Sequence, residues 1–138
     1  MQLFNAAVVQ WNEASAPVVA DMSDPTLDLA GFGDRTASDR AMMRSSVEAM
    51  DAAIAPGTIA EFAASVRAVD GTFSDRIDAI DAFVVALGAS DRSGMDLAVE
   101  RWEEAVARSE SALTEFLEAA RPYLSPEETL VWERHLGA

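Results

Sequence analysis

The chain has 138 residues and a formal net charge of −14, with 24 acidic residues against ten arginines and neither lysine nor cysteine. Because there is no cysteine, disulfide bonds, thiolate catalysis and thiolate metal sites are excluded. A surface this acidic repels phosphate backbones and anionic lipid headgroups, so we do not expect nucleic-acid binding. No apolar run approaches the ~18 to 20 residues of a membrane span, so we do not expect membrane insertion either. The charge instead favours basic partners or cations.

Apolar and polar residues are interleaved, since half of the chain is hydrophobic while the mean hydropathy is only +0.06. Such interleaving is typical of amphipathic elements, and no segment alternates with the period of two that a strand requires. The pattern predicts one all-α domain over residues 1–138. We expect an up-and-down antiparallel bundle of four long helices, followed by a short C-terminal helix.

The first predicted helix covers residues 3–22. Its apolar residues recur at spacings of three, four or seven, namely Phe4, Val8, Trp11, Val18 and Met22. Pro17 predicts either a kink or a break, because proline removes a backbone donor and Ser15 could cap a new turn.

The longest predicted loop covers residues 23–36, and its apolar residues should pack against the bundle: Leu27, Leu29 and Phe32. The second predicted helix covers residues 37–55. Thr36, followed three residues later by Asp39, indicates its start, and the Pro56-Gly57 pair ends it. Its inner stripe is formed by Met43, Val47, Met50 and Ile54.

The third predicted helix covers about residues 58–88 and begins with a capping box, Thr58 to Glu61. One apolar stripe continues from Ile59 to Leu87. The alternative is a break at Gly71 with a restart at Thr72, but the continuous stripe favours a single long helix.

The fourth predicted helix covers residues 95–121, after a loop over residues 89–94, and Pro122 ends it. Glu104 and Arg108 are spaced to pair on its outer face. Its inner residues are Met95, Ala98, Trp102, Val106, Leu113, Phe116 and Leu117. Ser125-Pro126-Glu127-Glu128 predicts a capped start for the short fifth helix.

The sequence contains no catalytic motif, and we predict no catalytic residue and no cofactor. His135 is the only histidine and lies at a helix end, where a capping or surface role is favoured. One histidine cannot supply the two Glu-x-x-His pairs of a di-iron bundle. The series Asp75, Asp78 and Asp81 could chelate a cation, but its position opposite the apolar stripe favours a solvated face.

A second acidic group surrounds the long predicted loop: Asp21, Asp24, Asp28 and Asp34. Its spacing does not match a calcium-binding EF-hand loop. These aspartates, with His135, are the candidates for a cation site or, least favoured, for a metal-dependent hydrolase. That site would require the loop to fold against the C-terminal helix.

Three tryptophans could line an apolar cavity between the helices: Trp11, Trp102 and Trp132. Met43 and Met50 would complete such a cavity, because methionine packs adaptably. The more usual role of these residues is to fill the core.

Two segments resemble helical-bundle domains of actinobacterial cell-envelope proteins and lipoproteins. They are the closing segment, residues 124–136, with its proline-capped acidic turn and its histidine, and the opening segment, residues 4–12. The resemblance covers about a fifth of the chain. It implies a bundle and an envelope location, with no chemistry to transfer.

The N-terminal residues lack the features of a signal peptide, so the chain as written is expected in the cytoplasm, or in the cell envelope if it is an excised mature domain. The favoured function is a non-enzymatic structural or interaction bundle that binds a protein partner or a second copy of itself. A small-ligand carrier and a cation-binding protein are the alternatives.

Overall fold

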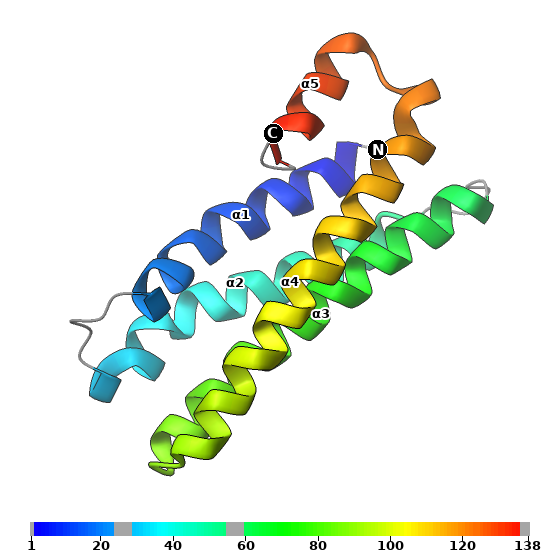
Figure 1. Cartoon of the computed structure of the whole chain (residues 1–138). Coiled ribbons are helices and arrows are strands. Elements are labelled where there is room, and N and C mark those ends of the chain that lie inside the picture. Colours follow the sequence, from blue (N-terminus) through cyan, green and yellow to red (C-terminus); the bar gives the residue numbers. More distant parts are fainter. Residues whose placement is uncertain (1, 24–28, 55–59, 136–138) are drawn as a thin grey trace.

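The computed structural model describes residues 2–23, 29–54 and 60–135, and structural statements below concern these residues. They form five α-helices and two 3₁₀ turns, with no strand. The helices are α1 (Gln2–Ser23), α2 (Phe32–Ala52), α3 (Ala60–Gly88), α4 (Arg92–Ala120) and α5 (Pro126–His135), with turns at Leu29–Gly31 and Arg121–Tyr123. The four long helices alternate in direction, and α5 turns back toward the first half of α1 (Figure 1). The predicted all-α bundle is therefore confirmed.

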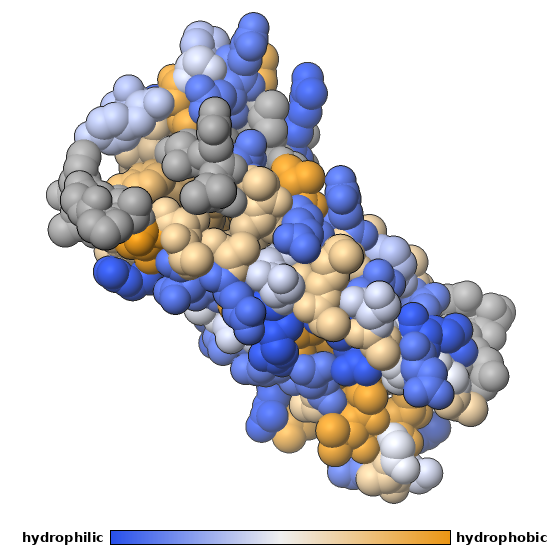
Figure 2. Space-filling model, turned by 180° about the vertical axis from the view of Figure 1, so that it is seen from behind, coloured by the Kyte–Doolittle hydropathy of each residue, from blue (hydrophilic) through white to orange (hydrophobic). Residues whose placement is uncertain are grey.

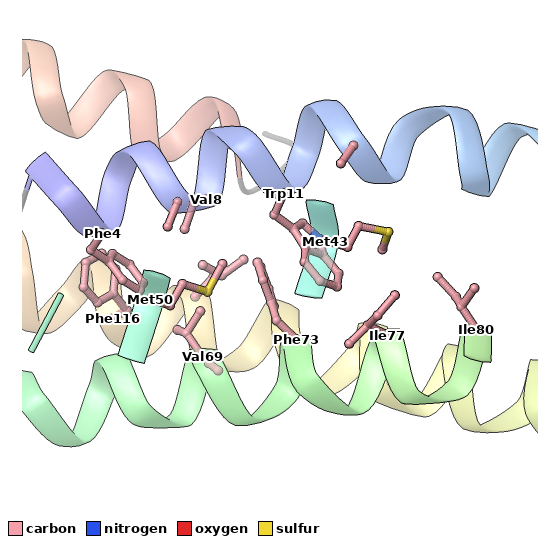
Figure 3. Packing of buried hydrophobic residues seen from close by; sticks show 14 of the residues in the cluster. Phe4, Val8, Trp11, Met43, Met50, Val69, Phe73, Ile77, Ile80 and Phe116 are labelled. Carbon is pink, nitrogen blue, oxygen red and sulfur yellow. The ribbon is translucent and has the colours of Figure 1, made fainter. Parts of the chain in front are cut away.

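The core lies along α3, and each of the other long helices places side chains against it (Figure 3). The apolar stripe of α3 is almost completely buried at Val66, Val69, Phe73, Ile77 and Ile80. α1 adds Phe4, Val8 and Trp11, α2 adds Met43 and Met50, and α4 adds Phe116. Aromatic pairs join the helices, with ring centroids 4.7 Å apart between Trp11 and Phe73 and 4.6 Å apart between Phe4 and Phe116.

Small residues line the contact between α3 and α4, which form a long antiparallel hairpin (Figure 1). On α4 the buried alanines recur every seven residues: Ala98, Ala105 and Ala112. On α3, Ala79 and Ala86 show the same spacing. A repeat of seven keeps one helix face toward its neighbour over several turns, and side chains this small let the two backbones approach closely.

The single long helix predicted across Gly71 is confirmed, because α3 has 29 residues and continues through this glycine. At ~1.5 Å per residue it spans roughly 43 Å. α1 likewise continues through Pro17, whose ring is exposed, so of the two alternatives for this proline the break is wrong. The predicted capping box at Thr58 lies outside the described residues.

The predicted start of the second helix was wrong, because α2 begins at Phe32 within the expected loop. Phe32 is completely buried and meets Phe83 edge to face at 5.4 Å, which fixes the first turn against α3. Thr36 is buried inside the helix, where its hydroxyl donates to the carbonyl of Phe32 at 2.7 Å. It therefore bonds back to the preceding turn and does not cap the helix.

The fourth helix also begins earlier than predicted, at Arg92. The Asp91 side chain caps it by accepting a hydrogen bond from the Gly94 amide at 3.0 Å. A Cβ at position 94 would come too close to that carboxylate, so a larger residue there would require the Asp91 side chain to shift. The start predicted for the fifth helix is confirmed, since Ser125 and Glu128 form a reciprocal capping box with hydrogen bonds of 3.4 and 3.2 Å.

The aspartates on the outer side of α3 form ion pairs between helices. Asp81 accepts from Arg40 at 2.8 Å and from Arg44 at 2.6 Å, both on α2. Asp75 pairs with Arg108 of α4 at 3.4 Å. Asp75 is exposed to solvent as predicted and Asp81 is only partly exposed, and each of them links α3 to a neighbouring helix. The predicted interaction of Arg108 within its own helix is replaced by this contact to α3.

The surface is largely hydrophilic. Figure 2 shows the back of the molecule, where polar side chains dominate and apolar ones gather toward the lower end, near the α3–α4 turn. In the described part of the chain, no helix is both long and apolar enough to cross a membrane.

The carboxylate of Asp70 lowers the stability of the fold when it is ionised. Asp70, on α3, is half-buried, and its Oδ1 has no hydrogen-bond partner. Burial raises the pKa of Asp70 to about 6, and the nearby charge of Asp51 on α2 acts in the same direction. The folded chain therefore holds this proton more tightly than the unfolded chain does.

We predict that Asp70→Asn raises the free energy of unfolding by about 1 kcal/mol near pH 7.5, after allowance for solvent screening of a half-exposed group. Above the folded pKa the unfavourable charge is fully present, so the advantage of the variant should shrink as the pH falls through about 6 and vanish near the unfolded value of about 4. Urea denaturation across this range measures it. Asp96→Asn, at an exposed carboxylate of α4, is the matched control, and equal effects of both variants would contradict the prediction.

Candidate functional site

An arginine lies where aromatic side chains of three helices meet. Arg76 is half-buried on α3, and its guanidinium carbon is 5.2 Å from the ring centroid of Trp11 on α1. The corresponding distances are 5.1 Å to Phe73 of α3 and 4.9 Å to Trp102 of α4. All three are within the range of about 6 Å in which a ring face attracts a cation.

The charge of Arg76 is not neutralised by an ion pair. The described residues form four salt bridges, and none of them involves Arg76. Its Nε is buried without a hydrogen-bond partner. Burial lowers the pKa of Arg76 to about 10, while the negative charge of Glu110 acts in the opposite direction. The group therefore remains a cation near neutral pH, although it is partly removed from water.

A small pocket of about 170 Å³ opens beside Arg76, between α1, α3 and α4. Its lining residues are Val8 and Asn12 of α1, Phe73 and Arg76 of α3, and Val106, Ser109, Glu110 and Leu113 of α4. Since a water molecule occupies about 30 Å³ in the liquid, the space corresponds to roughly five or six waters. The pocket thus suits a compact molecule.

Ser109 provides a second polar group in this pocket. Its side chain is buried, with 1% exposure, and its Oγ has no hydrogen-bond partner. A buried hydroxyl without a partner is unfavourable by about 1–3 kcal/mol. Arg76 and Ser109 both line the pocket, but the Oγ of Ser109 is itself covered, so the guanidinium is the group that an entering molecule would meet.

The guanidinium of Arg76 is chemically suited to bind a carboxylate or another small oxyanion. A guanidinium binds such groups through charge-assisted hydrogen bonds, which are stronger in surroundings of low dielectric constant. The lining residues contain no histidine, lysine or cysteine that could activate Ser109 as a nucleophile.

Two other hollows lie on α3 and α4. The larger, about 410 Å³, includes Asp75, Arg101 and Arg108, but Asp75 and Arg108 already pair with each other at its surface. The other is an apolar groove of about 340 Å³ beside the α3–α4 turn, with Val85 and Leu97 exposed. Neither contains a buried charge.

Of the residues predicted to bind a ligand, two are brought together. Trp11 and Trp102 both contact Arg76, although neither lines the pocket itself. Met43 and Met50 are completely buried in the core on α2 and do not line the pocket (Figure 3). Trp132 belongs to α5, but its side chain lies outside the description. The pocket is also more polar than the apolar cavity that we expected.

Only part of the predicted cation site lies within the described residues, so this prediction stays open. Asp21 is near the end of α1 and Asp34 is exposed in the first turn of α2, whereas Asp24 and Asp28 lie outside the described residues. His135 is the last residue of α5, which turns back toward the first half of α1, whereas Asp21 is near the other end of α1 (Figure 1). Within the described residues, no group of three potential ligands could hold a metal ion.

The sequence reasoning missed Arg76, Ser109 and Glu110. A signal was present for the arginine, since at 3.6 residues per turn Arg76 lies only about 20° from Val69 around the helix, inside the apolar stripe. A charge in that position indicates either a buried ion pair or a binding site. For Ser109 the signal was weaker, because serine is common at close contacts between helices.

The comparisons with known proteins add no functional information. No protein-family model, no curated protein and no solved structure matches the chain. The resemblance to actinobacterial cell-envelope bundles, with the location that it implies, therefore stays a prediction.

Proposed function

We propose that this protein is a non-enzymatic bundle that binds a small carboxylate or related organic anion in the pocket beside Arg76. The observation that carries the proposal is the half-buried guanidinium of Arg76, which is held by three aromatic rings and takes part in none of the salt bridges of the described residues. Buried charges are normally paired, because the loss of hydration is costly. A ligand would supply the missing negative charge.

The rest of the site supports this function. Trp11 and Phe73 place apolar faces against the cation, so it is held in position before a ligand arrives and loses little freedom on binding. This proposal revises our carrier hypothesis, because the ligand is recognised by charge and not only by apolar contact.

A second candidate is an interaction bundle, which the apolar groove near the α3–α4 turn favours. Val85 is 72% exposed and Leu97 is 48% exposed there, beside several alanines. Apolar surface gathered in one place is typical of contact with another protein. A second copy of this chain could occupy the groove without any other protein being present, so we take it as the partner.

We predict that propionate binds to the purified protein with a Kd on the order of 1 mM, equivalent to about 4 kcal/mol, in a buffer of low chloride. Isothermal titration calorimetry measures the affinity, and tryptophan fluorescence reports on the site because Trp11 and Trp102 contact Arg76. Arg76→Met should weaken binding at least tenfold. The matched control is Arg108→Met, at an exposed arginine of α4 that pairs with Asp75, and it should leave the affinity unchanged. Binding that is lost equally in both variants would refute the site.

We also predict that Arg76→Met leaves the free energy of unfolding unchanged or raises it by up to about 1 kcal/mol. Methionine fills a similar space without an unpaired charge, and each cation–π contact contributes only about 0.5–1 kcal/mol. Chemical denaturation of the ligand-free protein measures this. A loss of more than about 2 kcal/mol would mean that Arg76 serves the fold, and not a ligand.

For the interaction candidate, we predict that sedimentation velocity shows a dimer at high protein concentration and that Val85→Asp abolishes it, because a charge at a buried apolar contact loses its hydration. Leu130→Asp is the control, since this residue is 54% exposed on α5, away from the groove. A monomer at every concentration would exclude self-association through this groove.

A further inference from the structure

We propose that the ligand of the Arg76 pocket is a small zwitterion of the α-amino-acid class, with its carboxylate at Arg76 and its ammonium group at Glu110. The inference rests on the proposed function and narrows it to one class of ligand. Three features of the structure carry it: the opposite charges in the pocket, the size of the pocket and the net charge of the chain.

The pocket has a positive side and a negative side. Arg76 lies on α3 between aromatic rings, whereas Glu110 is exposed on α4, next to the buried Ser109. Both charged residues line the same pocket. Glu110 is close enough to Arg76 for its negative charge to favour the charged form of the guanidinium. No salt bridge within 4.0 Å joins them in the described residues, so a space separates the two charges. An ammonium carboxylate bridges such a separation with its own charges in the complementary order.

The size of the pocket limits the ligand. About 170 Å³ corresponds to roughly five or six water molecules at about 30 Å³ each. A compact amino acid fits within such a volume. The apolar part of the lining, Val8, Val106 and Leu113, leaves room for a short aliphatic side chain and offers no partner for a long polar one.

The net charge of the chain favours a zwitterion over a simple anion. With a net charge of −14, the protein repels any free anion that approaches it. A zwitterion carries no net charge and escapes this repulsion, while its carboxylate still meets the guanidinium inside the pocket. Glu110 at the exposed side of the pocket would attract the ammonium group and repel a second carboxylate.

The test compares three probes of the same skeleton: L-alanine, propionate without the ammonium group, and ethylammonium without the carboxylate. Calorimetry with the full chain should give an affinity for L-alanine at least tenfold higher than for either of the other two. Glu110→Gln should lower the affinity for L-alanine to about that for propionate, and should leave propionate binding equal or slightly stronger. Glu115→Gln, at another exposed glutamate of α4, is the control and should preserve the preference.

The possible outcomes separate this inference from the proposed function. If propionate binds as tightly as L-alanine, or if Glu110→Gln keeps the preference for L-alanine, the zwitterion is refuted and the anion site stands. If neither L-alanine nor propionate binds, both proposals fail. A tenfold preference that Glu110→Gln removes and Glu115→Gln preserves supports both.

Discussion

The apolar stripe of α3 is the surface on which the other long helices depend. Trp11 of α1 lies beside Phe73, Phe32 of α2 meets Phe83, and α4 packs along α3. The stripe must therefore stay on one face for the whole 29-residue length of the helix. A break at Gly71 would rotate one half against the other and separate the aromatic contacts of the two halves. The exposed glycine is tolerated because the packing on both sides of it outweighs its low helix propensity.

The same constraint places a charge inside the bundle. Arg76 follows Phe73 by three residues, so it shares the face that α3 presents to α1 and α4. Its long aliphatic stem can pack in the core while its guanidinium lies among aromatic rings. Yet the contact with rings replaces only part of the lost hydration, and the depressed pKa of Arg76 reflects that deficit. A fold under selection for stability alone would gain from an apolar residue here, which is why we assign this position to function.

Other charged residues of α3, unlike Arg76, form ion pairs with neighbouring helices. Asp81 accepts two arginines of α2 at 2.8 and 2.6 Å, and Asp75 faces Arg108 of α4. These charges have partners of opposite sign and link α3 to its neighbours. Asp75 and Asp81 form ion pairs, whereas Arg76 forms no salt bridge within the described residues. This difference identifies the candidate site better than the pocket volume does.

The sequence alone determined the helices and their inner faces, because periodicity of apolar residues and capping residues act locally. It predicted the continuity of α3, the capped start of α5 and the burial of residues such as Trp11, Met43 and Met50. It failed at the starts of α2 and α4, where Phe32 is fixed by a ring on another helix and Asp91 caps without the expected spacing pattern. Only the tertiary structure decided the site, since Arg76, Ser109 and Glu110 lie on two helices far apart in sequence. Whether a polar side chain finds a partner depends on which helix faces it, and no local pattern contains that information.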